Sequence, residues 1–301
     1  MKDLWLNGIM GAVVGDALGV PYEFKKRGTF ECTGMKEYGT HGMPKGTWSD
    51  DSSMIFATMD SIADNGKIVA DDIMERFTRW LDNAEYCAFG KVFDCGITVK
   101  EAIREGKAPS DEMSNGNGSL MRILPVCLFA VEHNIHPIRV KKLIHEVAGL
   151  THGHVRSKVA CGLYYTFVFE ILNKELGTKS DLYDRLQRGI DMGQILYKRS
   201  DELQYYSRMF DMDAFKELPE SEIRSSGYVL DSLEAAVWCL LNTESYEECM
   251  KKAVNLGEDT DTVACIAGGL AGLYYGYDSI PKEWVEEIKR LDYVKEMIER
   301  M

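Results

Sequence analysis

Residues 229–254, VLDSLEAAVWCLLNTESYEECMKKAV, carry the apolar spacing that decides the fold class. Leu230, Leu233 and Val237 recur at intervals of three and four residues, which places them on one face of an α-helix. The apolar positions of residues 246–254 follow the same spacing. This stretch therefore predicts two amphipathic helices in succession.

Helical spacing also dominates the rest of the chain, for example in residues 54–62. No clear run of alternating apolar and polar residues supports a sheet. Only seven prolines interrupt the 301 residues, and neither a repeat nor a low-complexity linker divides them. A chain of this length can bury a large core as one unit. We therefore predict an all-α fold in which residues 1–301 form a single compact multi-helix domain.

The composition and charge of the chain limit the kinds of partner that it can bind. Apolar residues make up 45% and charged residues 28% of the chain, as in ordinary soluble globular proteins. The net charge of −13 argues against nucleic acid and against an anionic membrane, because phosphate binding needs an excess of Lys and Arg. The apolar run from Leu4 to Val14 precedes Asp16 directly and lacks a cleavage site, which favours a buried helix over a signal peptide. We expect a monomer with neither a nucleic-acid nor a membrane partner.

The spacing of the cysteines and their sequence neighbours indicate a cellular compartment for the protein. Eight cysteines are scattered along the chain, and no two of them have the C-x-x-C spacing of a zinc site or a redox motif. Most lie among apolar residues, so we expect buried, reduced thiols and a cytoplasmic location.

Two short acidic clusters precede predicted helices. The first begins a helix near Ser52 and the second begins the helix that carries Val263 and Ile266. Their oxygen-bearing members are Ser49, Asp50 and Asp51 in one cluster and Asp259, Asp261 and Thr262 in the other. Either cluster alone could be a helix cap. A cap needs one side chain, however, and each cluster offers three, which suits two neighbouring ions. Because the ligands are oxygens without His or Cys, they favour hard cations such as Mg²⁺ or Mn²⁺.

A glycine-rich loop and a histidine pair offer further polar groups. Gly116–Ser119 could form an anion-binding nest at a helix start, or it could be a plain turn. His152 and His154 do not share a helix face, so a zinc-protease type of site is not indicated. We expect one of the two histidines to contact a ligand and the other to be structural.

Two carboxylates near the N-terminus have unusual neighbours. Asp16 lies among apolar residues, so it is either a satisfied core group or a partner of a site. Glu23 lies between Tyr22 and Phe24, which would raise its pKa and suit it to acid–base work. A glutamate on a surface loop is the alternative.

Together these motifs resemble the ADP-ribosylglycohydrolase family, which includes the dinitrogenase reductase-activating glycohydrolases. Five blocks follow that family's order along most of the chain, and the two acidic blocks are the most specific of them. The blocks are GAVVGDALGVPYEF, GTWSDDSSM, GNGSLMR, THGH, and GEDTDT with AGGLAG.

The resemblance implies an all-α fold with a two-metal centre in a cleft. The two acidic clusters match the family's two sets of metal ligands. Glu23 matches a glutamate that lies beside the centre in the serine-linked branch, and Asp94 matches an aspartate of the arginine-linked branch that approaches the scissile bond. The substrate contacts carried over from the family are Asn117, Gly118, Ser119, His152 and, weakly, Tyr228.

The implied reaction is hydrolysis of the bond between ADP-ribose and a modified protein side chain, with ADP-ribose as the product. The two cations would orient the distal ribose and a water, and Glu23 or Asp94 would be the general base or the acid. An acidic pocket favours arginine as the modified side chain, and a serine or other O-linkage is the alternative. Two other classes stay open: a two-metal phosphohydrolase that attacks the diphosphate, and a non-catalytic ADP-ribose-binding or crystallin-like protein.

Overall fold

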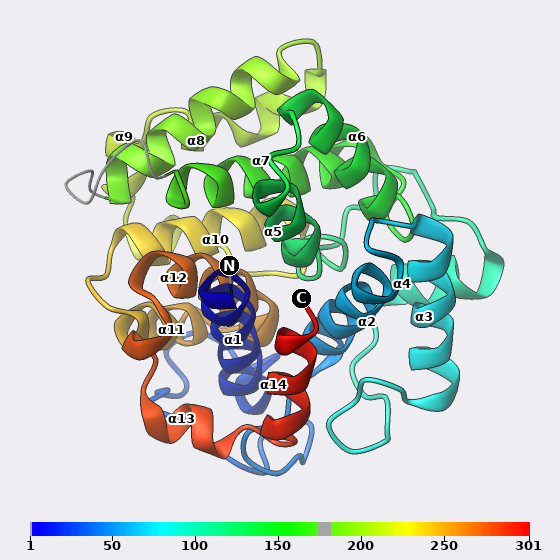
Figure 1. Ribbon diagram of the computed structural model, residues 1–301. Coiled ribbons are helices and arrows are strands. Elements are labelled where there is room, and N and C mark those ends of the chain that lie inside the picture. The colour runs from blue at the N-terminus through cyan, green and yellow to red at the C-terminus, as the bar shows by residue number, and fades with distance from the viewer. Residues whose placement is uncertain (1, 174–181) are drawn as a thin grey trace.

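A computed structural model describes residues 2–173 and 182–301, and these residues fold as one helical body (Figure 1). The α-helices are α1 (Lys2–Gly19), α2 (Asp50–Asn65), α3 (Ala70–Asn83), α4 (Ile97–Glu105), α5 (Leu124–Glu132), α6 (Pro137–Ala148), α7 (Val155–Ile171), α8 (Leu182–Tyr197), α9 (Met212–Lys216), α10 (Val229–Leu241), α11 (Tyr246–Asn255), α12 (Thr260–Tyr275), α13 (Lys282–Glu287) and α14 (Leu291–Glu299). Short 3₁₀ helices are η1 (Val20–Tyr22), η3 (Asp201–Met209), η4 (Glu220–Glu222) and η5 (Tyr277–Ser279). The described residues contain no strand and one isolated bridge, between Gly116 and Tyr228. The predicted all-α fold is confirmed.

An antiparallel pair, α1 and α12, forms the centre of the fold (Figure 1). The two backbones touch, because a Cβ atom built on Gly11 would lie only 2.3 Å from the carbonyl oxygen of Gly268. Near the end of α1, a Cβ atom on Gly19 would lie 2.3 Å from the Cα atom of Asp261. The C-terminal end of α1 is therefore held against the first turn of α12.

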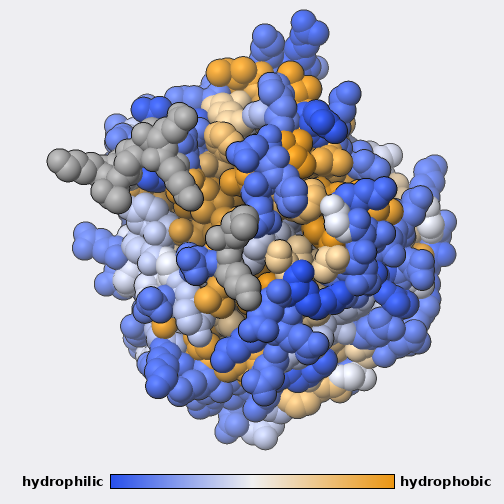
Figure 2. All heavy atoms as spheres, viewed as in Figure 1, coloured by the Kyte–Doolittle hydropathy of each residue, from blue (hydrophilic) through white to orange (hydrophobic). Residues whose placement is uncertain are grey.

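Several other helices bury the apolar faces of this pair. Helices α10 and α11 pack on α12, and α7 packs on α8, α6 and α12. Helix α1 is long and apolar enough to cross a membrane, but 83% of its apolar window is buried inside the protein. On the face in Figure 2, hydrophilic residues cover most of the surface and hydrophobic ones show in smaller areas between them. The prediction that the N-terminal run is a buried helix is confirmed.

The cysteines behave as the sequence predicts. All eight are unpaired, and seven of them are buried. Burial raises the pKa of the thiols, as at Cys127 and Cys239, so they act as small apolar side chains.

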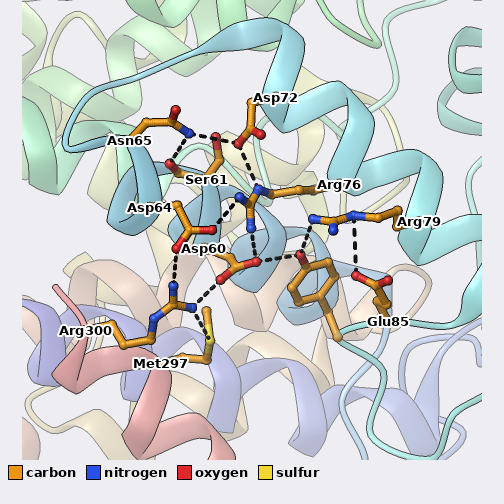
Figure 3. A network of polar contacts seen from close by, with 11 residues as sticks. Asp60, Ser61, Asp64, Asn65, Asp72, Arg76, Arg79, Glu85, Met297 and Arg300 are labelled. Carbon is orange, nitrogen blue, oxygen red and sulfur yellow. Dashed lines mark hydrogen bonds and ion pairs between the residues drawn. The ribbon is translucent and has the colours of Figure 1, made fainter.

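A network of ion pairs joins α2, α3 and α14 (Figure 3). The buried guanidinium of Arg76 contacts Asp60, lies 2.7 Å from Asp64 and lies 2.8 Å from Asp72. Arg300, the residue directly after α14, contacts the same Asp60 and lies 2.7 Å from Asp64. The network therefore fixes the C-terminal part of α2, whose first turn carries Asp50 and Asp51.

Candidate active site

The first acidic cluster lies at the start of α2, which begins at Asp50, two residues before Ser52. Ser49 is the N-cap residue, and its hydroxyl oxygen accepts a hydrogen bond from the amide of Asp51 at 3.2 Å. The same hydroxyl donates to Oδ2 of Asp51 at 2.8 Å. Asp50 lies on the cleft side of this turn and is almost fully buried. Capping by the Ser49 hydroxyl leaves the Asp50 carboxylate and Oδ1 of Asp51 available, so a helix cap and a ligand role for these aspartates are compatible.

The second acidic cluster lies at the start of α12. Asp259 is the N-cap residue, but its side chain makes no capping hydrogen bond. Its Oδ2 atom instead accepts a hydrogen bond from the side-chain amide of Asn117 at 2.8 Å. The hydroxyl of Thr262 donates to Oδ2 of Asp51 at 3.3 Å, which joins the two clusters across 211 positions of the chain.

Asp16 completes this acidic centre, although the sequence showed only that its carboxylate needed a partner. Its carboxylate accepts from the amides of Ser49 and Ser52, at 3.0 Å each, and from the Ser52 hydroxyl. Burial raises the pKa of Asp16 to about 6, against these hydrogen bonds, which lower it. Asp16 therefore holds the first turn of α2 while its own carboxylate faces the other aspartates.

The donor set fits divalent cations. One oxygen from each of Asp16, Asp51 and Asp261 lies within 4.8 Å of the others, and Glu23, Asp259 and Asp261 form a second such group. Oδ1 of Asp51 and Oδ2 of Asp261 are buried and have no hydrogen-bond partner in the described part of the chain. Unpaired buried carboxylate oxygens are costly, and a hard cation would satisfy them.

The pKa values of the acidic centre support the same interpretation. Burial, and then the charges of neighbouring carboxylates, raise the pKa of Asp50, Asp51 and Asp261 well above the usual range. Like charges this close need either protons or cations between them.

Glu23 lies beside the acidic centre and is buried, which excludes a glutamate on the surface. The amide of Phe24 donates to the carbonyl of Glu258 at 2.6 Å, and the amide of Glu258 donates to the carbonyl of Lys25 at 2.8 Å. These two bonds hold the segment with Glu23 against the segment with Asp259. Burial raises the pKa of Glu23 to about 8, as its aromatic neighbours predicted.

Asp94 approaches Glu23 from the loop before α4. One atom each of Glu23, His41 and Asp94 lies within 4.8 Å of the others. Asp94 has a φ of 47°, a strained conformation that is more often found at functional sites. Burial raises its pKa. His41 has no sequence signal, because it lies in a loop without periodicity, 18 positions after Glu23.

The glycine-rich loop forms the wall of the cleft that faces these carboxylates. The structure corrects its expected context: residues 118–122 form turns, and α5 begins only at Leu124. The loop is fixed instead by Asn117, whose amide nitrogens donate to Gly227 from the backbone and to Asp259 and Ser232 from the side chain. An anion here would meet loop amides and no helix N-terminus.

The remaining predicted substrate contacts are distributed unevenly around the cleft. Gly118 and His152 line it, whereas the Ser119 side chain is fully buried and accepts a hydrogen bond from Cys161 at 3.5 Å. The hydroxyl of Tyr228 is 3.1 Å from the guanidinium of Arg156, and this side chain does not line the cleft.

The two histidines have separate environments, as expected. Burial lowers the pKa of His152 to about 3, so its ring is neutral, and its Nδ1 atom lies 2.9 Å from the Thr151 hydroxyl. His154 caps α7, because its side chain accepts from the amide of Arg156 at 3.1 Å. His152 is thus the member of the pair that can meet a ligand.

The cleft between these walls has a volume of about 300 Å³. Its lining includes Glu23, Asp50, Asp94, Asp259 and Thr262 on one side and residues 116–118 with His152 on the other. Buried carboxylates with raised pKa values that face a glycine-rich loop are typical of a catalytic site. Fold and site together define an all-helical protein with the features of an enzyme.

The chain belongs to the ADP-ribosylglycohydrolase family, whose model matches residues 2–301. ADP-ribosylarginine hydrolase Tri1 of Pseudomonas putida is 28% identical over 302 residues, which cover 98% of this chain and 76% of that relative. An ADP-ribosyl glycohydrolase of dinitrogen reductase from Rhodospirillum rubrum is 29% identical, over 96% of this chain and 91% of its own length. A solved structure described as an ADP-ribosylglycohydrolase-related protein complex is 29% identical, with a TM-score of 0.80, and covers 99% of this chain and 96% of that one.

Proposed function

We propose that this enzyme hydrolyses the glycosidic bond between ADP-ribose and a modified arginine of a protein, with two divalent cations, Mg²⁺ or Mn²⁺, as cofactors. The family membership supports an ADP-ribosyl hydrolase. The observation that carries the proposal is the meeting of the two acidic clusters beside Glu23, with unpaired oxygens on Asp51 and Asp261.

The residues that would hold the cations are the two acidic clusters of the sequence, with Asp16 behind them. When bound, divalent cations supply Lewis acidity to the ribose hydroxyls and to the attacking water. The chain itself orients these ligands: Ser49 and Asp16 fix Asp51, and Asn117 fixes Asp259. Such outer hydrogen bonds set the direction of each carboxylate.

Glu23 and Asp94 would have different roles in the reaction. Glu23 is next to both Asp259 and Asp261, so its carboxylate would face the attacking water and the ribose. Its raised pKa suits a group that accepts a proton in one step and returns it in another. Asp94 lies beside Glu23 and lines the same cleft, where it would hold the departing guanidinium.

The other end of the ligand would lie along the glycine-rich loop. A Cβ atom built on Gly118 would lie 2.8 Å from Cγ2 of Val99 and 3.0 Å from Cε1 of His152. Glycine at this position lets Val99 and His152, which both line the cleft, pack against the loop whose amides would meet the diphosphate. If the diphosphate binds at this loop, the cations would contact the ribose. A phosphohydrolase would need the phosphate on the cations, so this arrangement disfavours that class.

Arginine is favoured over serine by the charge of the cleft. Among the described residues, neither Glu23 nor Asp94 pairs with a Lys or an Arg. A cationic guanidinium would supply the missing positive charge, whereas a serine hydroxyl would not.

The test is a panel of arginine-linked and serine-linked ADP-ribosyl peptides with each cation. We expect free ADP-ribose from the arginine peptide and a kcat lower by about 10²–10⁴-fold in Asp94→Asn, because that change removes only the charge. Cleavage of the serine peptide alone would refute the linkage. Full kcat in Asp94→Asn on the arginine peptide would refute the role of Asp94.

A further inference from the structure

The loop of residues 38–43 is built to meet the segment around Glu23. The amide of Tyr38 donates to the carbonyl of Met43 at 2.8 Å, which closes the loop. The amide of Thr40 then donates to the carbonyl of Pro21 at 3.1 Å, and the Thr40 hydroxyl donates to the carbonyl of Glu23 at 2.6 Å. These bonds fix the position of residue 41 relative to the Glu23 side chain.

Close backbone packing reinforces this placement. A Cβ atom built on Gly39 would lie 2.0 Å from the carbonyl oxygen of Pro21, so only glycine permits this approach. The loop is therefore docked on residues 21–23 through its backbone, independently of the His41 side chain.

The imidazole of His41 makes two kinds of contact. Its Nε2 atom hydrogen-bonds to Oε2 of Glu23. Its ring packs against two aromatic rings, with centroid distances of 5.9 Å to Phe24 and 5.2 Å to Phe93. Only 15% of the side chain is exposed, so ring and hydrogen bond are both held in place.

His41 is also the one basic side chain that contacts Glu23 among the residues described here. Glu23 has acidic neighbours on two sides, Asp94 and the pair Asp259 and Asp261. Without a donor on Oε2, the carboxyl of Glu23 would rotate to minimise this repulsion.

We infer that His41 is a positioning residue for the proposed reaction: it holds Oε2 of Glu23 so that the other oxygen faces the scissile bond. This inference rests on the proposed function, and it adds a residue outside both acidic clusters. Misplacing a reacting group by about 1 Å can cost on the order of 100-fold in rate, so the loss of this bond should affect kcat.

Two substitutions separate the hydrogen bond from the packing. His41→Phe keeps a ring between Phe24 and Phe93 but removes the donor. His41→Gln places an amide nitrogen near the position of Nε2 but removes the ring. For the arginine-linked peptide, we expect kcat to fall by about 10–100-fold in His41→Phe and to stay within about threefold of wild type in His41→Gln. The affinity for ADP-ribose should change little in either variant.

A packing role predicts the opposite order, with His41→Phe active and His41→Gln impaired, and that order would overturn the inference. Equal kcat in wild type and His41→Phe would overturn it too. Crystal structures of both variants give a readout without activity: the Glu23 carboxyl should rotate in His41→Phe and keep its orientation in His41→Gln. An unmoved Glu23 in His41→Phe would contradict the inference, even if the wild-type chain cleaved neither linkage and the proposed function failed.

Discussion

The contact between α1 and α12 makes a sharp prediction about one methyl group. In Gly11→Ala, the new Cβ atom would lie 2.3 Å from the carbonyl oxygen of Gly268, and real Cβ contacts essentially never fall below 3.0 Å. The helices must therefore separate by about 0.7 Å. In Gly8→Ala, one turn earlier on the same helix, the nearest atom is the flexible Cδ2 of Leu273 at 3.1 Å. Both changes gain the same helix propensity, so their difference isolates the packing.

We expect overpacking to cost Gly11→Ala about 2–3 kcal/mol relative to Gly8→Ala. In a chain of this size, that difference lowers the melting temperature by roughly 3–5 °C. The separation would also move Asp261 away from Asp16, so calorimetry should show roughly tenfold weaker Mn²⁺ binding in Gly11→Ala alone. Equal melting temperatures and equal Mn²⁺ affinities in the two variants would refute the reasoning.

Three other predictions concern the acidic centre, the glycine-rich loop and the ion-pair network. The raised pKa values of Asp50, Asp51, Asp261 and Glu23 mean that the folded, cation-free protein binds more protons than the unfolded chain, so its stability should fall between about pH 4 and pH 8. The rise in melting temperature on adding Mn²⁺ should therefore be larger at pH 8 than at pH 5.5, and a cation-free melting temperature that rises over this range would contradict the sign. Gly118→Ala should weaken ADP-ribose binding by about tenfold or more, whereas Gly96→Ala, whose Cβ atom meets only Val99 at 3.8 Å, should not, as titration calorimetry can show. Arg76→Ala leaves Asp60 with Arg300 and the Tyr86 hydroxyl and should lower the free energy of unfolding by about 3 kcal/mol, and a loss under 1 kcal/mol in urea titrations would show that the network adds little.

The helices and the acidic clusters could be predicted from sequence for a physical reason. Apolar spacing such as that of Leu230, Leu233 and Val237 depends on local helix geometry, and so do the oxygen-rich starts of α2 and α12. That these starts meet depends on the glycine contacts between α1 and α12, which no local pattern encodes. The resemblance to a known family supplied this pairing at the sequence level.

Other features follow from tertiary contacts alone. His41 reaches Glu23 only because its loop docks on Pro21, so the spacing of the two residues in the sequence could not predict their contact. Asn117 lines the cleft, and its side chain also donates to Ser232 and Asp259, two contacts that its sequence neighbours do not encode. The sequence left the glycine-rich loop as a helix start or a plain turn, because turns can carry the same apolar residues as a first helical turn.

The most direct test of the central claim is to identify the product from an ADP-ribosyl-arginine peptide. The full chain would be incubated with Mg²⁺, with Mn²⁺ or with a chelator, and the nucleotides would be separated by chromatography. We predict intact ADP-ribose and unmodified arginine in the presence of at least one cation, and none with the chelator. Release of AMP, undiminished release of ADP-ribose with the chelator, or no product under any condition would contradict the proposed function.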